Sequence, residues 1–584
     1  MIFLVLPALL GLVSAIWLLV AWDLWQWRLW LTKLLEEEEV AKCPLEQRAL
    51  WTIRNVRYDL SSFLSSHPGG ERAIRMGQGR NCTELFLSYH SLSAPGVVEK
   101  VLARYQAPLP PAVPGDADYM SDFDHAATPF YDTLKSRVRD YFTQQGRSHK
   151  APPEKCLCLC GATCATFVCY YYVAMHGSIL ATFLLPVAYW LGPSSMMHDG
   201  SHLALSRYPW VNWLAASLGS AHSSITTWCL QHVIGHHTRT NMHGEDPDLY
   251  HFNFLTRWGI LGFRSGPCSR QEDVHSDWKM GLAVRMPLAT LGPSILWDLL
   301  SILVSPRGHY MGLVPPVPPS STRPRLLVLA QHLGHLAGRL LVLLLAIVIP
   351  VVRGVQVESH GWPVPRGAMG LLTLVPLTVW RAALALVPFL LHGVIFYGFS
   401  QVSHIQSECF DQNGHTGRAS DVGKGQGEGE RESEGGGEGT VETSKATRGD
   451  KAVESEAGEW AIHQVNTTLD YNPQSRFWTW CSNGLNLQTV HHLFPHVDWW
   501  HYPSLEPILR QTCADFGVRY NCVPSFGHAL RSHVQHLRRL NDEERDAAAE
   551  PAPRDYWTSR TLEGLAFLGE LDSLCYQPAA LALG

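Results

Sequence analysis

The apolar stretch "CLCLCGATCATFVCYYYVAMHGSILATFLLPVAYW" (residues 156–190) decides the fold class of this chain. A helix needs roughly 20 apolar residues to cross a bilayer, so the stretch is long enough for two helices joined at "MHG" (residues 175–177). Residues 326–352 and 382–403 form two more apolar runs, each long enough for one span. We therefore expect a mostly α-helical integral membrane protein with four spans.

The composition agrees with a membrane protein. Charged residues make up 17% of the 584 residues, below the ~25% that is typical of soluble domains. The net charge of −6 arises from residues 411–459, which contain 12 acidic and 6 basic side chains, so the rest of the chain is about neutral. No basic stripe is present, and we therefore expect no nucleic acid partner.

The N-terminal residues "MIFLVLPALLGLVSAIWLLVAW" (residues 1–22) are long enough to span a membrane and lack the basic start of a signal peptide. Arg28 and Lys33 follow this segment. Because basic residues stay on the cytosolic side, we interpret residues 1–30 as a signal anchor that leaves the following chain in the cytosol.

The remaining chain divides by composition. Residues 411–458 are rich in Gly, Glu and Ser and bury too little apolar area to offset their chain entropy, which predicts a disordered insertion. The other predicted units are a small soluble domain (45–108), a Pro-rich linker with a lead-in (109–155), a membrane domain in two parts (156–410 and 459–530) and a C-terminal tail (531–584).

Four cysteines of "CLCLCGATC" (residues 156–164) open the first apolar run. Buried free thiols are the favoured interpretation, and palmitoylation at the membrane edge is the alternative.

The soluble domain carries two histidines that can hold a haem. His67 lies in "HPGG" (residues 67–70), where a turn presents the imidazole, and His90 follows 23 residues later. Two imidazoles on opposite sides of an apolar slot are what a six-coordinate electron-transfer haem requires. "VRYDLSSFLSSHPGG" (residues 56–70) resembles cytochrome b5, although Arg57 replaces the usual Val. The resemblance implies a small α+β domain that binds b-type haem between His67 and His90.

Three histidine clusters lie near the apolar runs. "HDGSH" (198–202) and "QHVIGHH" (231–237) contain histidine pairs spaced i, i+4, which share one face of an α-helix, and "LNLQTVHHLFPHV" (485–497) adds an adjacent pair. A lone histidine is usually a core residue, but such a set suits iron, zinc or copper and exceeds what one ion takes. The residues are His198, His202, His232, His236, His237, Gln488, His491 and His492. An even number of predicted spans separates the clusters, so we expect all of them on the same membrane face as the haem domain.

The motifs HDxxH, a box ending in HH, and QxxHH behind a cytochrome b5-like domain resemble the front-end fatty acid desaturases, over residues 50–525 apart from the insertion. The second and third boxes resemble most the branch that acts on C20 and C22 polyunsaturated chains. The implied architecture is a four-span helical bundle with a cytosolic di-iron cap, preceded by the anchor and the haem domain.

The resemblance also implies the site residues. The seven histidines of the clusters would ligate two iron ions, together with His404 from "FSQVSHIQ" (residues 399–406), where Ser403 replaces the family's Asn. Gln488 takes the place of a histidine found in other membrane desaturases and is our candidate catalytic residue. His232 departs from the family pattern, because three residues rather than two separate it from His236. "DPD" (246–248) is either a set of acids that orient the histidines or part of an interfacial loop.

By the same resemblance, the protein removes two hydrogens from adjacent methylenes of an acyl lipid or acyl-CoA, with O₂ as cosubstrate, and Δ5 or Δ4 desaturation is favoured. Cytochrome b5 reductase would pass electrons from NADH to the haem, in the endoplasmic reticulum membrane. Two enzymatic alternatives are a sphingolipid Δ8-type and a Δ6 acyl desaturase. A membrane-anchored electron carrier with an inactive desaturase half is the non-enzymatic alternative.

Overall fold

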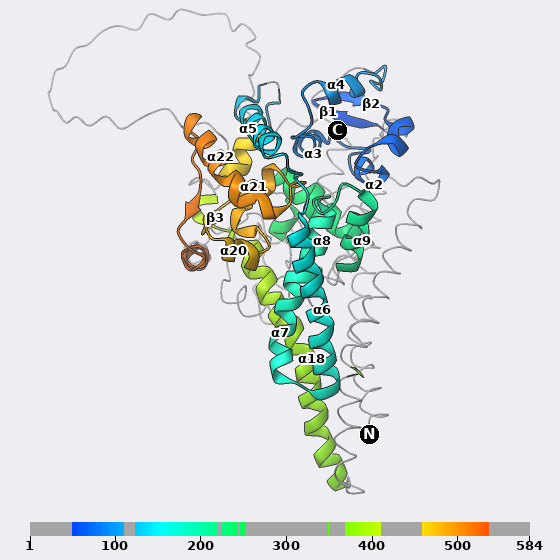
Figure 1. Cartoon of the computed structure of the whole chain (residues 1–584), viewed down its shortest axis with the longest axis vertical. Coiled ribbons are helices and arrows are strands. Elements are labelled where there is room, and N and C mark those ends of the chain that lie inside the picture. The colour runs from blue at the N-terminus through cyan, green and yellow to red at the C-terminus, as the bar shows by residue number, and fades with distance from the viewer. Residues whose placement is uncertain are drawn as a thin grey trace, which may run out of the picture.

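The computed structural model describes residues 50–109, 123–125, 127–219, 225–242, 246–250, 348–349, 368–409 and 458–536, which are mostly helical, as predicted (Figure 1). The expected N-terminal anchor (1–30), the predicted insertion (411–458) apart from Gly458, and the predicted tail (531–584) beyond residue 536 lie outside the described residues. The predicted span at residues 326–352 lies outside them almost entirely, so the count of four spans stays a prediction.

The first domain is a small α+β unit, as expected for a cytochrome b5-like domain. Strands β1 (Trp51–Ile53) and β2 (Val56–Tyr58) form an antiparallel hairpin. Its two turn residues, Arg54 and Asn55, both have positive φ, as a two-residue type I′ turn requires. The helices of this domain are η2 (Ser61–Ser66), α2 (Glu71–Arg75), α3 (Thr83–Tyr89) and α4 (Val97–Leu102).

The apolar stretch that begins at residue 156 forms two helices, joined where the turn was expected. Helix α6 (Pro153–His176) ends at Gly177, whose φ of 59° closes the helix, and Ser178 caps α7 (Ile179–Tyr189) by accepting the amide of Ala181. Helix α7 continues through the π-helical segment η3 (Trp190–Ser194) into α8 (Ser195–Ser201). The first histidine box therefore lies at the end of the second long helix.

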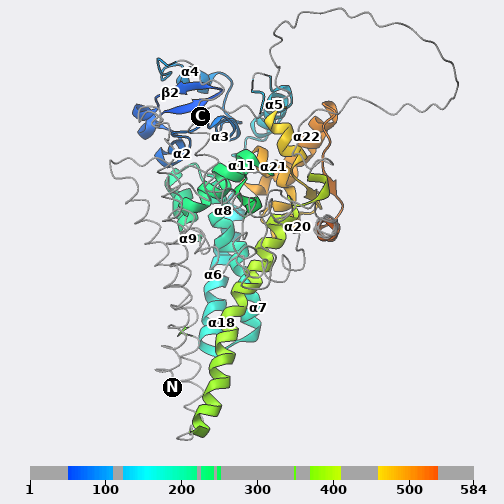
Figure 2. The same ribbon diagram turned by 180° about the vertical axis from the view of Figure 1, so that it is seen from behind.

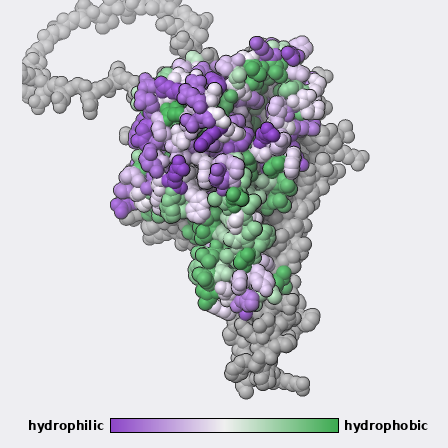
Figure 3. All heavy atoms as spheres, in the orientation of Figure 1, coloured by the Kyte–Doolittle hydropathy of each residue, from purple (hydrophilic) through white to green (hydrophobic). Residues whose placement is uncertain are grey.

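Three helices of the described chain are long and apolar enough to cross a membrane: Pro153–His176, Ile179–Ser201 and the segment Val379–Val402 of α18 (Ala368–Val402). α6, α7 and α18 lie side by side in both views (Figures 1 and 2). Figure 3 shows apolar side chains over this part of the surface, and Leu157, Phe167 and Leu180 are each at least 70% exposed. An apolar surface of this extent indicates contact with lipid.

The cysteines of the first apolar run differ from the favoured expectation. Cys156, Cys158, Cys160 and Cys164 are exposed on α6, so the interpretation as buried thiols was wrong. Consecutive turns of α6 place these small side chains on its outer faces, while Leu159 and Thr166 are buried.

A second helical layer lies at the end of the bundle where α8 ends (Figure 1). It consists of α5 (Pro129–Gln145), α19 (Trp460–Asn466), α20 (Arg476–Cys481), α21 (Gln488–Leu493) and α22 (Tyr502–Asp515), with the two-residue parallel strands β3 (Asp470–Tyr471) and β4 (Cys522–Val523). Phe130, Leu134, Trp460, Val490 and Phe494 belong to its apolar core. The Glu459 carboxylate accepts the backbone amides of Phe130 and Tyr131 and so joins α5 to α19.

Candidate metal centre

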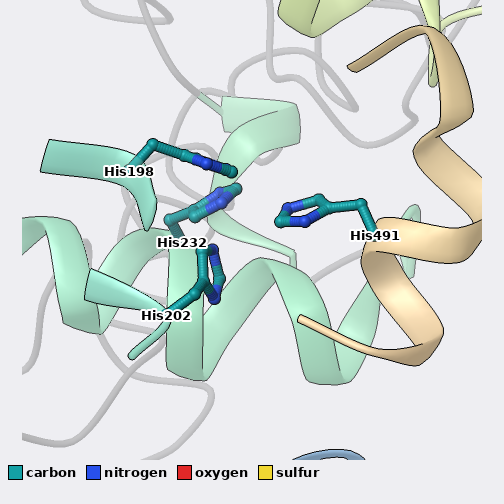
Figure 4. Close-up of side chains that lie close together, drawn as sticks. All are labelled: His198, His202, His232 and His491. Atoms are coloured by element: carbon teal, nitrogen blue, oxygen red, sulfur yellow. The ribbon is translucent and has the colours of Figure 1, made fainter. Parts of the chain in front are cut away.

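Histidines from four distant segments of the chain meet in one buried cluster between the bundle and the second layer. Their ring nitrogens form two groups of histidines alone, each with its ligand atoms within 4.8 Å of one another, and a third group joins His232 and His236 to the carboxylate of Asp248. The first group is His198, His202, His232 and His491, whose rings turn toward one another in Figure 4. The second group is His236, His404 and His492.

The first box lies on α8, one helical turn apart, as its spacing predicted. His198 is within α8 and His202 directly follows it, and their ring centroids are 4.8 Å apart. Both residues enter the first group, and His202 is fully buried.

The second box is not the α-helix that we expected. Helix α10 (Ile225–Trp228) leads into the π-helical segment η4 (Cys229–His236), followed by α11 (His237–Arg239). Bonds to the fifth residue widen a π-helix, so His232 aligns with His237, with their Nε2 atoms 3.2 Å apart, and not with His236. His232 departs from the family pattern because three residues separate it from His236. The wider turn of the π-helix accommodates the extra residue and still brings His232 to the cluster. His236 points into the second group.

Gly235 allows the acidic loop to approach the second box. A Cβ atom on Gly235 would lie 2.6 Å from Cγ of Pro247, in the "DPD" sequence. The closeness of this loop lets the Asp246 carboxylate reach Nδ1 of His236 at 3.0 Å. Of the two roles left open for these acids, the structure therefore supports orientation of a histidine.

The third box divides its two histidines between the groups. His491 joins the first group and His492 the second, because neighbouring residues of an α-helix point about 100° apart. The short helix α21 that carries them is held at its start by Asp470, whose carboxylate accepts the backbone amide of Thr489 at 2.9 Å.

His404 and Gln488 complete the second group. Nε2 of His404 is 3.3 Å from Nε2 of His236, and the Gln488 side-chain nitrogen is 2.9 Å from the same His404 atom. Oε1 of Gln488 is buried without a hydrogen-bond partner among the described residues. Because the two ends of an amide are distinguished only by their partners, a half-turn would aim this oxygen at the histidines.

His237 lies between the groups. Its ring centroid is 4.6 Å from that of His491 in the first group and 4.3 Å from that of His492 in the second. All eight predicted histidines and Gln488 thus lie in the cluster. A further histidine of the third stretch, His496, is buried beside Tyr89 and outside both groups.

The Nδ1 atoms of six histidines are held by protein groups, which is the arrangement that metal-ligating imidazoles need in order to present Nε2 in one orientation. The pairs are His198 with Asp199 Oδ1 (3.1 Å), His202 with Tyr89 Oη (2.8 Å), His491 with Tyr502 Oη (3.1 Å), His236 with Asp246 Oδ2 (3.0 Å), His492 with Gln464 Oε1 (2.8 Å) and His404 with the carbonyl of Thr467 (3.3 Å).

The Nε2 atoms fit a metal. Those of His198, His202 and His491 are buried without a hydrogen-bond partner among the described residues. Two ligand atoms that each lie about 2.1 Å from the same ion are about 3.0–3.4 Å apart. The Nε2 atoms of His232 and His237 are 3.2 Å apart, and those of His236 and His404 are 3.3 Å apart, so both distances fall in this range. The donor set is almost entirely imidazole, which suits iron, zinc or copper.

Burial keeps most of these imidazoles neutral and so able to ligate. It lowers the pKa of His202, His232 and His491 well below the usual value, and the neighbouring histidines lower it further. His236 is the exception. Burial also acts to lower its pKa, but the carboxylates of Asp246 and Asp248 outweigh this and raise it to about 9.

A buried ion pair that the sequence did not reveal joins the first and third boxes. Nζ of Lys155, at the start of α6, is 2.5 Å from Asp199 and 2.7 Å from Asp498, and all three side chains are at most 4% exposed. The same nitrogen lies 4.1 Å from the ring centroid of Trp499. Asp199 also contacts His198, so Lys155 acts on the orientation of a predicted ligand. Lysine at this position had no motif to mark it.

The two predicted haem histidines face each other in the first domain. Their ring centroids are 6.1 Å apart, which leaves room for an ion about 2 Å from a nitrogen of each ring. Nδ1 of His67 lies 3.2 Å from the carbonyl of Gly70, and Nδ1 of His90 lies 2.8 Å from that of Phe86. A Cβ atom on Gly69 would lie 2.8 Å from the His67 ring, which explains the glycine after Pro68.

Two protein-family models match this chain. The family model "Fatty acid desaturase" matches residues 174–524, more than half of the chain, and the model "Cytochrome b5-like Heme/Steroid binding domain" matches residues 36–107. The chain is 27% identical to "Probable Delta(5) fatty acid desaturase C" of Dictyostelium discoideum, covering 88% of this chain and 96% of that protein.

Two further relatives cover most of the chain. An acyl-lipid (8-3)-desaturase of Physcomitrium patens is 29% identical, over 83% of this chain and 86% of its own. An acyl-lipid omega-13 desaturase of Chlamydomonas reinhardtii is 25% identical, over 83% and 92%. The convergent histidines, the paired haem histidines and both family matches lead to one conclusion: the chain belongs to the fatty acid desaturase family and carries a cytochrome b5-like haem domain ahead of its desaturase domain.

Proposed function

We propose that this protein is a front-end desaturase that introduces a cis double bond into C20 polyunsaturated acyl chains, at the Δ5 position. The observation that carries the proposal is the pair of buried imidazole groups, His198 with its neighbours and His236 with its neighbours, beside a haem domain on the same chain. The Δ5 position is favoured because one relative of similar length is named a Delta(5) and another an (8-3) desaturase.

In this proposal each histidine group holds one iron ion, with His237 between them and Gln488 at the second. The two ions, when bound, supply the O₂ chemistry that breaks unactivated C–H bonds. The chain's own residues hold and orient this centre. Asp199, Tyr502 and Asp246 fix the imidazole orientations, and burial of the cluster excludes water from it.

The haem domain would supply electrons one at a time. We propose cytochrome b5 reductase as the donor, NADH as the electron source and the endoplasmic reticulum as the membrane, with the haem domain and the histidine groups on its cytosolic face. The common position of the haem domain and the histidine boxes at one end of the helical bundle supports a shared compartment (Figure 1).

The function is tested by expressing the full chain in yeast fed 20:3, 20:4 and 22:5 acids. A new Δ5 double bond in the lipid extract is expected for the wild type. His67→Ala should lose product through its electron supply, and His491→Ala should lose product together with iron. The exposed His528 supplies the matched control, and His528→Ala should retain both.

The same extracts separate the competing positional assignments. The relatives of this chain carry names that specify different positions, among them an acyl-lipid omega-13 desaturase and an sn-1 linoleoyl-lipid 6-desaturase. Mass spectrometry must therefore locate the new double bond. A double bond at Δ4, Δ6 or ω-13 would overturn the Δ5 assignment and keep the desaturase. A new double bond in the sphingoid base, with unchanged fatty acids, would overturn the acyl substrate as well.

A further inference from the structure

Tyr89 belongs to both sites of the molecule. It directly precedes the haem histidine His90 at the end of α3, and its hydroxyl lies 2.8 Å from Nδ1 of His202 in the first histidine group. Its hydroxyl thus reaches a histidine 113 positions later in the chain. Only the backbone between two consecutive residues separates the Tyr89 ring from the His90 ring.

The contact is part of a packed interface between the haem domain and the desaturase domain. The apolar core of the haem domain continues into Cys229, Leu230 and Val233 of η4, the segment that carries the second histidine box. The guanidinium of Arg239, in α11, lies 3.4 Å from the buried carboxylate of Glu84 in α3. α3 is therefore held against the second box by apolar and charged contacts at once.

The tautomer of His202 gives the contact a direction. Its Nε2 atom is buried without a hydrogen-bond partner among the described residues and faces the first group, as a ligand nitrogen does. Nδ1 then carries the proton and donates it to the Tyr89 hydroxyl oxygen. The ring of His496, 6.1 Å from that of Tyr89 between centroids, packs beside this hydrogen bond.

We propose that Tyr89 is the bridge through which electrons pass from the haem to the histidine-bound metal centre, by way of the His202 hydrogen bond. The inference rests on the proposed function, since it requires haem at His67 and His90 and iron at the histidine groups. Each transfer oxidises the ferrous haem by one electron and reduces one ferric ion of the centre by one electron, and no covalent bond forms or breaks. Two transfers, with the haem reduced again between them, deliver the pair that desaturation consumes.

The route needs no proton movement at the tyrosine. The phenol oxygen accepts the His202 N–H, and this hydrogen bond is the link that the route uses. Electron tunnelling weakens more steeply across gaps than along bonds and hydrogen bonds, and the path from His90 to His202 contains one hydrogen bond and otherwise only covalent bonds. Tyr89 therefore acts as a positioning residue that couples two sites.

The chain offers a matched control in Tyr502. Its hydroxyl makes the corresponding contact to Nδ1 of His491, a second member of the same group, at 3.1 Å. Tyr502 starts α22 in the second layer and is not next to a haem histidine. Tyr89→Phe and Tyr502→Phe thus each remove one hydrogen bond to one histidine of the first group, and only the first variant interrupts the proposed route.

The experiment measures electron transfer inside the protein without substrate or O₂. The full chain in detergent, loaded with haem and ferric iron, is mixed anaerobically with one equivalent of dithionite. The haem absorbance then reports its reduction and the later loss of its electron to the iron. Protein loaded with zinc in place of iron provides the blank, in which the reduced haem should persist. Iron content and the haem reduction potential are measured for each variant.

In Tyr89→Phe, haem reoxidation should slow several-fold, because the single hydrogen bond of the route becomes a gap, while the haem potential and the iron content of the loaded protein stay unchanged. Tyr502→Phe, which disturbs only the orientation of His491, should slow the rate less than Tyr89→Phe does. An unchanged rate in Tyr89→Phe, or equal slowing in both variants, would overturn the bridge. A wild-type protein that binds no iron, or whose haem is not reoxidised, would instead overturn the proposed function itself.

Discussion

The two histidine groups differ in their number of imidazoles and in the groups that hold them. The first contains four histidines, with Nδ1 partners that include Asp199, Tyr89 and Tyr502. The second contains three histidines with the Gln488 amide, and its His236 is held by Asp246. The Nδ1 partners of the first group are one carboxylate and two phenols, whereas those of the second are one carboxylate, one amide oxygen and one backbone carbonyl.

This difference implies that the two proposed metal positions should not respond equally to mutation. A group with four imidazoles retains three after one loss, but a group with three retains two and an amide. The predictions below test that asymmetry in order of decreasing expected effect.

The largest effect is expected at the ion pair that supports the first group. Lys155→Met leaves Asp199 and Asp498 buried without their cation, which should cost about 3–5 kcal/mol of folding free energy. Thermal unfolding in detergent measures it, with the exposed Lys100→Met as the control. An unchanged midpoint for Lys155→Met would mean that the pair does not stabilise the first group.

Removal of one ligand candidate from each group tests the asymmetry directly. His404→Ala should weaken iron retention by more than about a hundredfold, beyond the 10–100-fold cost of losing an outer partner, because only two histidines of its group remain. His198→Ala should weaken it less. Iron per protein is measured after dialysis against a graded chelator series, and greater loss in His198→Ala would reverse the comparison.

The carboxylate of the second group should matter next. Asp246→Asn keeps the shape of the side chain but removes the charge beside His236, and should weaken iron binding at the second group by about 10–100-fold. Asp248, whose Oδ2 atom is 3.6 Å from Nδ1 of His236, supplies the control, and Asp248→Asn should have a smaller effect. The chelator series distinguishes the two, and equal losses would remove the special role of Asp246.

Gln488→His should make the groups more alike. The substitution brings a fourth imidazole within reach of His404 and His492, so the second group should resist chelation about as well as the first. Gln488→Leu, which adds no ligand atom, is the comparison and should not gain resistance. If both variants bind iron as the wild type does, Gln488 does not lie at a metal.

The smallest effect is expected from the Gly/Glu-rich insertion. Replacing residues 411–457 by a flexible Gly/Ser linker should leave product formation and iron content unchanged, because the composition of this segment predicts no packed structure. Product formation is measured by lipid analysis after expression in yeast, and iron content by metal analysis of the purified protein. Loss of iron would show that the insertion supports the second group, whose His404 precedes it.

Much of the fold and of the candidate site could be read from patterns. The apolar run at residues 156–190 forms two helices with the turn at Gly177, as predicted. The predicted haem histidines His67 and His90 lie opposite each other. His198 and His202 of the first box lie close together, as their spacing in HDGSH predicts. The prediction for the second box was wrong about its helix type. The i, i+4 spacing of its histidines suggested an α-helix, but the chain forms the π-helical segment η4 there. A winding change of this kind depends on tertiary packing, which the residue spacing of the box does not report.

The sequence by itself determined the membrane-spanning character of the helices and the identity of the imidazoles, since apolar length and residue type are local properties. Only the tertiary structure decided which histidine belongs to which group, because His491 and His492 separate by the pitch of α21 and His404 arrives from another helix. It alone placed Tyr89 against His202 and Lys155 between two aspartates. These contacts join residues more than 40 positions apart, and no spacing rule reaches across that distance.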